Sequence, residues 1–198
     1  MTFNKPDTKL DECIFIAKQI IPADLCDAVI KDIETRPWKP HSWHNNATDT
    51  CKSEETMELD IQYSTPELNK ALSPFVIESG RIYNQKYQFK CGVLGAGGQF
   101  IEQFSPIRFN RYKPGQIMRQ HFDHIHSLFD GKIKGVPVLT FIFNFNDDYE
   151  GADLFFWENT VVKLGKGDII MFPSNWLFPH GVTEATKGKR YSGSVWGW

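Results

Sequence analysis

The stretch Leu139-Thr140-Phe141-Ile142-Phe143-Asn144-Phe145 alternates between large apolar side chains and smaller, partly polar ones. Because successive residues of a β-strand point to opposite faces, the leucine and the three phenylalanines share one face of a predicted strand. Thr140, Ile142 and Asn144 share the other face. We expect the phenylalanine face to pack under helices and the smaller face to line a cavity.

Further short strands are predicted on both sides of this one. The full set covers about residues 107–112, 117–123, 137–146, 153–157, 160–164, 168–172, 177–182 and 190–197. Turn signals rich in glycine, proline and asparagine separate them, among them Lys113-Pro114-Gly115 and Lys187-Gly188-Lys189. Short strands at such spacing indicate a mainly β protein, a sandwich or a jelly roll.

The N-terminal half is predicted to supply supporting helices. A short strand over residues 12–17 precedes a helix over about residues 22–34, which has apolar residues at helical spacing. Thr65 is a predicted N-cap for a second apolar periodic segment, in which Pro74 predicts a kink or two shorter helices. Residues 36–53 are expected to be irregular, either as a binding loop or as a disordered one.

Composition narrows the class of protein. A net charge of -2 over 198 residues gives no support to a nucleic-acid partner or an anionic membrane surface. The chain contains 16 Phe and 6 Trp, which indicates a broad apolar interior or a pocket walled with aromatic rings. No apolar run long enough for a signal peptide or a membrane span occurs, and the four cysteines form no CxxC pair. We therefore expect a reduced, cytoplasmic protein without a zinc ribbon; the cysteines are Cys13, Cys26, Cys51 and Cys91.

His121, Asp123 and His180 are candidate metal ligands. His121 and Asp123 stand at i and i+2 of a predicted strand, so both side chains can hold one ion from the same face. His180 is the candidate for the third ligand. Two histidines and one carboxylate with open coordination positions are typical of non-heme Fe(II) oxygenases. The HxD tripeptide alone is weak evidence, because its ordinary explanation is a surface turn.

Arg190 is a candidate anion-binding residue near the predicted metal ligands. In the predicted strand 190–197 the residues Arg190, Ser192, Ser194 and Trp196 share one face. An inward-facing arginine is costly unless it holds an anion, so the pattern indicates a ligand carboxylate. Lys189 has the wrong register to face inward. The other histidines are interpreted as polar loop residues, with substrate contact as the minor alternative; they are His41, His44, His124 and His126.

The ordered motifs from about Arg108 to Trp198 resemble the Fe(II)/2-oxoglutarate-dependent dioxygenases, most closely the prolyl 4-hydroxylase-like branch. The motifs are Arg111-Tyr112-Lys113-Pro114-Gly115, His121-Phe122-Asp123, Phe143-Asn144-Phe145-Asn146, Glu150-Gly151-Ala152-Asp153-Leu154-Phe155-Phe156, Lys166-Gly167-Asp168, Pro179-His180-Gly181-Val182 and Gly188-Lys189-Arg190-Tyr191-Ser192, followed by Trp196. The resemblance implies a double-stranded β-helix, which is a jelly-roll, cupin-like fold. It implies one dioxygenase domain over residues 1–198, with helical support over about 18–90 and the β-helix core over about 91–198.

The resemblance also implies roles for individual residues. His121, Asp123 and His180 would be the iron ligands, and Arg190 would hold the distal carboxylate of 2-oxoglutarate. Tyr112 would hydrogen-bond the cosubstrate. Further cofactor-binding positions would be Thr140, Ile142, Asn144, Val182, Ser192, Ser194 and Trp196. Two departures stand out, since many relatives have Tyr at position 144 and Gly-Gly at Gly151-Ala152, where the small alanine is expected to matter little.

By this resemblance the chain is expected to hydroxylate a C–H bond with Fe(II), 2-oxoglutarate and O2, and with L-ascorbate as an optional reductant. The co-products would be succinate and CO2, and Asp123 favours hydroxylation because halogenating relatives lack this carboxylate. The first expectation for the substrate is a prolyl residue in a peptide or protein, which the loops at 36–56 and 124–136 could cover. The alternatives are a free amino acid or another small molecule, or a non-catalytic metal-binding cupin-like module.

Overall fold

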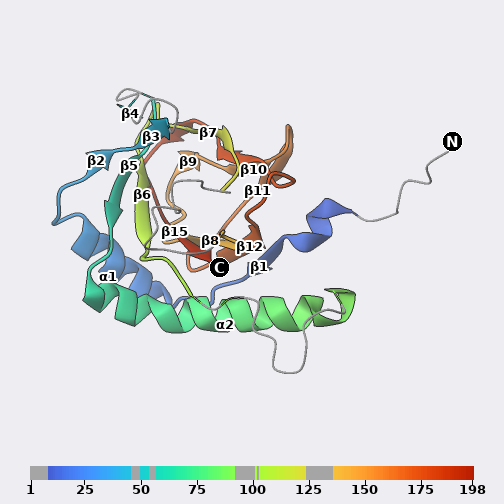
Figure 1. The fold of residues 1–198 in the computed structure, drawn as a ribbon. Helices are drawn as coiled ribbons and strands as arrows, with labels where there is room; N and C mark the ends of the chain where they lie inside the picture. The colour runs from blue at the N-terminus through green and yellow to red at the C-terminus, as the bar shows by residue number, and fades with distance from the viewer. Residues whose placement is uncertain (1–8, 46–49, 54–56, 92–100, 102, 124–135) are drawn as a thin grey trace, which may run out of the picture.

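The computed structural model describes residues 9–45, 50–53, 57–91, 101, 103–123 and 136–198 (Figure 1). In chain order the elements are η1 (Leu10–Cys13), β1 (Phe15–Ala17), α1 (Ala23–Ile33), β2 (Lys39–Pro40), β3 (Ser42–Asn45), β4 (Thr50–Ser53), β5 (Asp60–Tyr63), α2 (Pro66–Cys91), β6 (Arg108–Tyr112), β7 (Met118–His121), β8 (Leu139–Asn144), β9 (Glu150–Gly151), β10 (Leu154–Phe156), β11 (Thr160–Val162), β12 (Ile169–Pro173), β13 (His180–Val182), β14 (Ala185–Lys187) and β15 (Arg190–Gly197). The mainly β class with two supporting helices agrees with the sequence prediction.

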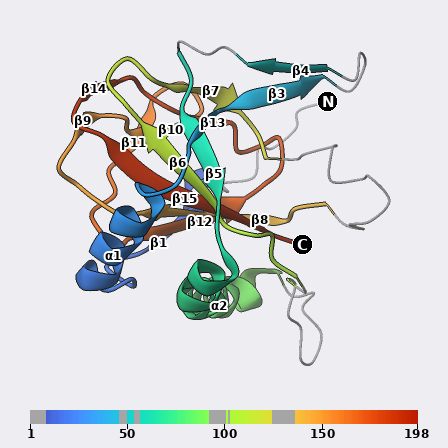
Figure 2. The ribbon, with the colours of Figure 1, turned by 90° about the vertical axis from the view of Figure 1, so that its left-hand side faces the viewer.

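The described residues form two larger antiparallel sheets, two two-stranded ribbons (β14-β9 and β3-β4) and one helical layer. The large sheet has the order β1-β12-β8-β15-β6-β5-β2, and the small sheet has the order β11-β10-β13-β7. The helices α1 and α2 cover one face of the large sheet, and the small sheet lies on its other side (Figures 1 and 2). The space between the two sheets is therefore shielded from the helices by the central strands β8 and β15.

The two faces of β8 enter two different cores. Phe141, Phe143 and the following Phe145 are fully buried in a cluster that contains residues of both helices, such as Val29 and Leu72. Ile142 belongs to the second cluster, which lies between the sheets. Burying a phenylalanine side chain contributes about 2 kcal/mol, so the alternation seen in the sequence fixes which face of β8 meets the helices. The prediction that the phenylalanine face of this strand packs against the helices is confirmed.

The second helix differs from the prediction. α2 runs through Pro74 as one helix of 26 residues, so the expectation of two shorter helices is wrong. Pro74 is exposed, which lets water satisfy the backbone carbonyl that the missing N–H leaves free. The predicted cap is present, because Thr65 Oγ1 accepts a hydrogen bond from the backbone N–H of Leu68 at 3.3 Å. Neither helix in the described part of the chain is long and apolar enough to cross a membrane.

Short strands replace the irregular segment expected at residues 36–53. β2 pairs with β5 at the edge of the large sheet, and β3 pairs with β4 as a separate ribbon. β5, which was not predicted, joins β2 to β6. Of the described part of this segment, β2 therefore extends the edge of the large sheet, and β3 and β4 form their own ribbon.

Candidate metal centre and ligand cavity

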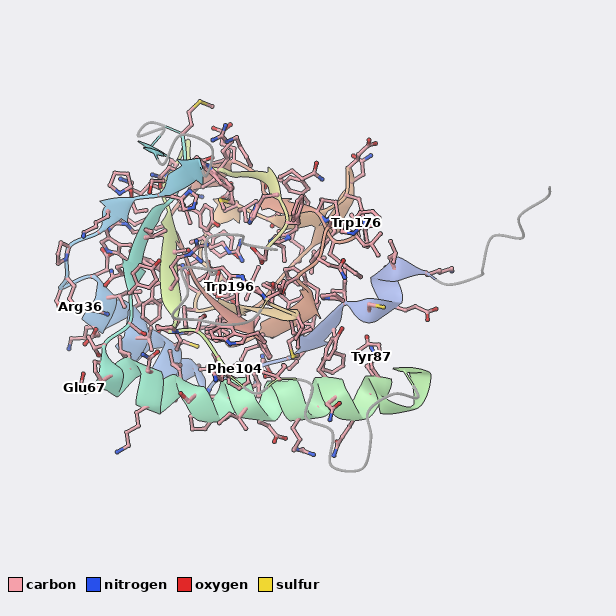
Figure 3. All side chains as sticks on the ribbon, viewed as in Figure 1. Arg36, Glu67, Tyr87, Phe104, Trp176 and Trp196 are labelled. Atoms are coloured by element: carbon pink, nitrogen blue, oxygen red, sulfur yellow. The ribbon has the colours of Figure 1, made fainter. Side chains whose placement is uncertain are left out.

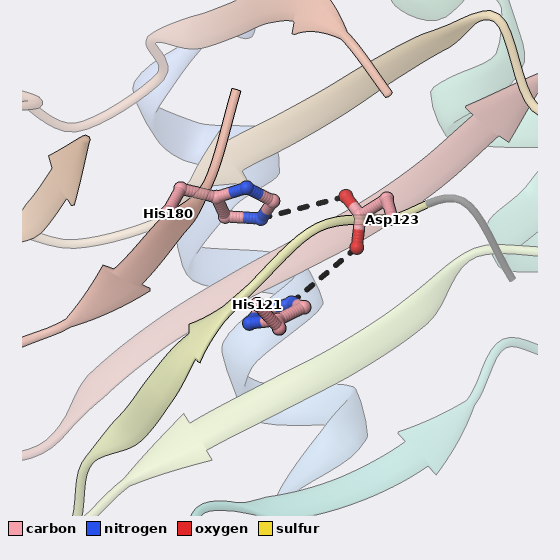
Figure 4. Close-up of side chains that lie close together, drawn as sticks. All are labelled: His121, Asp123 and His180. Carbon is pink, nitrogen blue, oxygen red and sulfur yellow. Dashed lines mark ion pairs between the residues drawn. The ribbon is translucent and has the colours of Figure 1, made fainter. Parts of the chain in front are cut away.

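The three predicted metal ligands meet where β7 and β13 lie side by side (Figure 4). His121 ends β7 and pairs in register with His180, the first residue of β13. Asp123 follows two positions later, with its Oδ1 at 3.4 Å from His121 Nε2 and its Oδ2 at 3.5 Å from His180 Nε2. All three ligand atoms lie within 4.8 Å of one another. The spacing suits a single ion bound from one side.

Local sequence explains how these strands come so close. A Cβ atom on Gly181 would lie 2.8 Å from the Met118 backbone oxygen and 2.6 Å from the Phe155 ring. Only glycine therefore lets β13 approach β7 at this point. β7 is shorter than predicted and ends at His121, after which Phe122 points outward and is 46% exposed. Asp123 nevertheless turns inward, as the i, i+2 argument required.

Hydrogen bonds fix the orientation of both imidazoles. His121 Nδ1 donates to the Arg119 backbone oxygen at 2.8 Å, and His180 Nδ1 donates to the Phe178 backbone oxygen at 3.0 Å. Because a carbonyl oxygen can only accept, Nδ1 carries the proton in each ring. In the neutral form of each histidine, the Nε2 lone pair then faces Asp123. Carbonyl partners of this kind orient the histidine ligands of metal sites.

Asp123 is buried and ionised. Burial by itself raises its pKa, but the interactions with His180 and His121 and the hydrogen bond from Thr140 outweigh burial, so the pKa of Asp123 lies below its usual value. Thr140 Oγ1 donates to Asp123 Oδ2 at 2.8 Å, and the Ser174 hydroxyl, at 2.8 Å from Thr140 Oγ1, is then left to donate to Thr140. This network supports the carboxylate from the large sheet.

The protonation states fit a metal ion. Burial lowers the pKa of His180 to about 4, against the opposing attraction of Asp123. The imidazole is therefore neutral beside an ionised carboxylate, which are the forms that bind a metal. No lysine or arginine of the described chain forms an ion pair with Asp123. A buried carboxylate without a fixed cation, flanked by two Nε2 lone pairs, matches the donor set of Fe(II) sites.

A pocket between the sheets is lined by these three residues together with residues of the large sheet. Of the predicted cofactor-binding residues, those on its wall are Tyr112, Ile142, Val182, Arg190, Ser192, Ser194 and Trp196. Its wall also includes Arg108, Asn110, Met118 and Leu154, which were not predicted. Metal ligands and Arg190 therefore open onto the same space.

Arg190 lies on the cavity wall, 1% exposed and in register with Tyr112 of β6. Its Nε donates to Asn144 Oδ1 at 2.9 Å, and its Nη1 donates to the Ala152 backbone oxygen at 2.8 Å. No carboxylate in the described chain pairs with it. Lys189 turns away, with its Nζ at 3.6 Å from Glu34 Oε2. The predicted register of β15 is the one observed.

Two predicted cofactor-binding residues lie behind the cavity wall instead of on it. Thr140 supports Asp123, and Asn144 accepts the Nε–H of Arg190 while its amide donates to backbone oxygens, including that of Asn146 at 2.7 Å. Both side chains are fully buried. Strand alternation assigned the face correctly but not the depth, so these two residues act through Asp123 and Arg190.

Arg108 and Asn110 are the polar residues that sequence reasoning missed. They share a face of β6 with Tyr112, at i, i+2 and i+4, so the strand pattern around Tyr112 could have found them. Arg108 Nε donates to Asn110 Oδ1 at 3.1 Å, and Asn110 Nδ2 donates to Ser194 Oγ at 2.9 Å. The Arg108 guanidinium lies over the Trp196 ring, 5.0 Å from its centre.

His41, expected in a polar loop, is instead buried beside the site. Its Nδ1 lies 2.9 Å from Glu58 Oε2, which also accepts the Trp43 Nε1–H at 2.6 Å. The Trp43 ring meets the His121 ring edge-on at 5.5 Å between centres. These contacts attach the segment before β3 to the metal-binding end of β7. The His44 side chain, His124 and His126 lie outside the described residues, as does most of the 124–136 loop.

Comparisons with known proteins point to one family. Residues 107–198 match the model of the 2OG-Fe(II) oxygenase superfamily. A PKHD-type hydroxylase from Shewanella sp. (strain MR-7) is 33% identical over 98 residues, which is 48% of this chain and 43% of the relative. This chain therefore spans less than half the length of the curated relatives that it matches first.

Two solved structures share the fold. A Pseudomonas putida prolyl-4-hydroxylase superposes with a TM-score of 0.62 at 20% identity, covering 93% of this chain and 91% of the other. A Trichoplax adhaerens prolyl hydroxylase, in complex with a peptide fragment of the hypoxia inducible factor oxygen degradation domain, gives 0.67 at 15% identity, covering 94% and 83%. Such likeness confirms the predicted double-stranded β-helix.

Proposed function

We propose that this chain, which over residues 107–198 and in its fold is a prolyl 4-hydroxylase-like 2OG-Fe(II) oxygenase, hydroxylates a C–H bond using Fe(II), 2-oxoglutarate and O2. The observation that carries the proposal is the common cavity. His121, Asp123 and His180 converge at one part of its wall, and Arg190 is built into the same wall without an anionic partner in the described chain.

The ligand set would hold iron through the Nε2 atoms of the two histidines and one ionised carboxylate. Bound Fe(II) would supply the redox chemistry that couples oxidative decarboxylation of 2-oxoglutarate, with succinate and CO2 as products, to hydroxylation of the substrate. The side chains contribute positioning. Thr140 and the carbonyl partners of the two histidines hold the three ligands in place before any ion arrives, so little reorganisation is needed on binding.

Arg190 and Tyr112 would bind the distal carboxylate of 2-oxoglutarate. The guanidinium is positioned by Asn144 and Ala152 and lies 5.6 Å from the centre of the Tyr112 ring. Burial raises the pKa of the Tyr112 hydroxyl, which therefore keeps its proton and can donate it in a hydrogen bond. A cation and a neutral donor on one wall are complementary to a carboxylate.

The protein also restricts water near the metal ligands. The His180 ring packs against the Phe172 ring at 4.7 Å and the Phe156 ring at 5.8 Å between centres. Both phenylalanines are fully buried. This apolar wall lowers the local dielectric constant, which strengthens the electrostatic contacts inside the cavity and limits side reactions with water.

For the substrate we propose a prolyl residue in a peptide or protein. The support is the prolyl hydroxylase identity of the solved neighbours, one of which is bound to a peptide. A free amino acid or another small molecule is the second candidate, because the fold by itself does not determine the substrate. L-ascorbate is proposed only as a reductant that would maintain Fe(II).

The first test is spectroscopic. Anaerobic addition of Fe(II) and then 2-oxoglutarate is expected to give the weak visible charge-transfer band of the chelate, and His180→Ala is expected to abolish it. If folded wild-type protein gives no band, the chain is a metal-binding module and not an oxygenase.

A second test identifies the substrate class. Proline-containing peptides are expected to stimulate succinate formation and to gain the mass of one oxygen atom, read by mass spectrometry. The control panel consists of free amino acids at the same concentration. Turnover with a free amino acid and with no peptide would replace the peptide proposal by the small-molecule one.

A further inference from the structure

A second guanidinium lines the ligand cavity, that of Arg108, the first residue of β6. Arg108 is half-buried, and Asn110 fixes its Nε, while no hydrogen bond of the described residues uses its terminal nitrogens Nη1 and Nη2. No carboxylate of the described chain lies within ion-pair distance of Arg108, whereas its neighbour Arg111 pairs with both Glu34 and Asp60. Arg108 thus presents an uncompensated positive charge with a free donor edge.

Trp196 supplies an independent sign of a missing ligand in the same cavity. Its ring lies beneath the Arg108 guanidinium, it is 7% exposed, and its Nε1–H is a buried donor with no acceptor among the described residues. Figure 3 shows Trp196 inside the ring of strands, in contrast to Trp176 on the outside. An unpaired buried donor costs about 1–3 kcal/mol, so an acceptor from outside the chain is expected there.

The sum of charges in the cavity indicates that the ligand of Arg108 and Trp196 is not the cosubstrate. This step rests on the proposed function. The two positive charges of Fe(II) and that of Arg190 equal the negative charges of Asp123 and of the two carboxylates of 2-oxoglutarate. Arg108 is then the cation of the cavity that remains without a counter-charge. In a partly dry cavity an unmatched cation is unfavourable, so a further anion is the natural partner.

We propose that Arg108 and Trp196 bind a carboxylate of the substrate. The substrate class is then a molecule that carries a carboxylate near the C–H bond to be hydroxylated. That carboxylate has two sources, the free carboxylate of an amino acid or the acidic side chain next to the modified residue of a peptide. The terminal Arg108 nitrogens offer the two-pronged geometry that carboxylates accept.

The test compares ligand pairs that differ only in this charge. Protein loaded with Fe(II) and 2-oxoglutarate under argon is titrated with three pairs, read by calorimetry and by tryptophan fluorescence. The pairs are propionate and propionamide, N-acetyl-L-proline and its amide, and the capped dipeptides Pro-Glu and Pro-Gln. The second pair reports on a terminal carboxylate and the third on a side-chain carboxylate. At least one acid is expected to bind about tenfold tighter than its neutral partner, as a charge-assisted hydrogen bond predicts.

Variants assign the preference to the two residues. Arg108→Gln is expected to remove the preference for the acid, Arg108→Lys to retain part of it, and Trp196→Phe to reduce it by about threefold through loss of one donor. Arg81→Gln, on the exposed surface of α2, is the matched control and is expected to behave as wild type. Thermal unfolding of each variant excludes a general loss of structure.

The possible outcomes are distinct. Equal binding of acid and amide by wild type, including no binding of either, overturns the inference and leaves the proposed function intact. A preference that survives in Arg108→Gln also overturns it, because Arg108 would then only pack on Trp196. A large loss of 2-oxoglutarate affinity in Arg108→Gln would assign Arg108 to the cosubstrate instead. If wild type binds no 2-oxoglutarate, the proposed function fails and the inference fails with it.

Discussion

Arg190 and Arg108 lie on the wall of one cavity, yet the chain treats them differently. Arg190 is 1% exposed and is held through Nε and Nη1 by Asn144 and by Ala152. Arg108 is half-buried, and the described chain binds only its Nε. A guanidinium fixed at two points suits a ligand that is the same in every turnover. One with free terminal nitrogens can adapt to a ligand that varies.

The supports of Arg190 also carry a conformational cost. Ala152 adopts a φ of +49°, and the preceding Gly151 has a φ of +72°. Left-handed backbone at a residue with a Cβ atom costs about 1–2 kcal/mol, so the alanine of this pair matters more than its small size suggested. The strained backbone places the Ala152 carbonyl against Arg190. Among the described residues, Arg108 is hydrogen-bonded only by Asn110, two positions along β6.

The largest expected effect removes the fixed guanidinium. Arg190→Ala is expected to weaken 2-oxoglutarate binding at least about 100-fold, because a two-pronged charge-assisted pair is worth about 3 kcal/mol. Lys189→Ala, the neighbouring cation that faces Glu34 instead, is the matched control and is expected to change affinity less than about threefold. Calorimetry with the Fe(II)-loaded protein under argon measures both. Equal losses would mean that β15 presents the other face to the cosubstrate.

The next effect concerns the metal end of the cavity. Thr140→Val keeps the shape of a fully buried side chain but removes the hydroxyl that donates to Asp123. Loss of such a supporting bond is expected to lower Fe(II) affinity about tenfold, with the fold retained. Thr160→Val, on the exposed strand β11, is the control. Unchanged affinity in Thr140→Val, measured by metal competition, would show that Asp123 needs no support from the large sheet.

Much of this cavity could be predicted because its residues lie on regular strands. Alternation placed Arg190 inward and Lys189 outward, and the i, i+2 rule brought His121 and Asp123 to one side. It also assigned the phenylalanines of β8 to the helical side, where they are buried. The approach of His180 to His121 came from family resemblance, since no local pattern specifies which strands become neighbours across two sheets.

The residues that were missed or misplaced depend on contacts between strands. Asn144 and Thr140 were given the right face, but whether a side chain reaches a cavity or a neighbour depends on the strand beyond it. Arg108 was not predicted, although it lies on the same face of β6 as Tyr112. β2 and β5 pair with each other at that edge, and neither shows the apolar alternation that reveals a buried strand.

A substitution that removes one of the two acceptors of Arg190 would make this guanidinium more like that of Arg108. Asn144→Ala removes the acceptor for Arg190 Nε and leaves Nη1 bound to Ala152. We expect about tenfold weaker binding of 2-oxoglutarate, a smaller loss than for Arg190→Ala, because the charge stays and only its orientation is freed. Asn159→Ala, at an exposed turn, is the control. A loss as large as that of Arg190→Ala, with an unchanged unfolding temperature, would mean that Asn144 itself contacts the cosubstrate.

The smallest expected effect is a change in the pKa of His41, which depends on the charge of Arg108 and can be measured without catalysis. Burial lowers the pKa of His41 below its usual 6.5, the charge of Arg108 lowers it further, and the contact with Glu58 opposes both effects. Because the unfolded chain then takes up the proton first, His41 stabilises the fold above about pH 6.5, and this contribution is lost as the pH falls through the folded pKa. Arg108→Gln is expected to raise the pKa of His41 and so to weaken this pH dependence.

A carboxylate bound beside Arg108 is expected to act in the same direction as that substitution. The ligand compensates the charge that disfavours protonated His41, so the pKa of His41 is expected to rise by a few tenths of a unit when N-acetyl-L-proline is added. Proton NMR of the His41 ring, followed from about pH 5 to pH 8, measures the shift. N-acetyl-L-prolinamide is the neutral control. Equal shifts with acid and amide, or the same acid-induced shift in Arg108→Gln, would show that no anion binds at the free guanidinium.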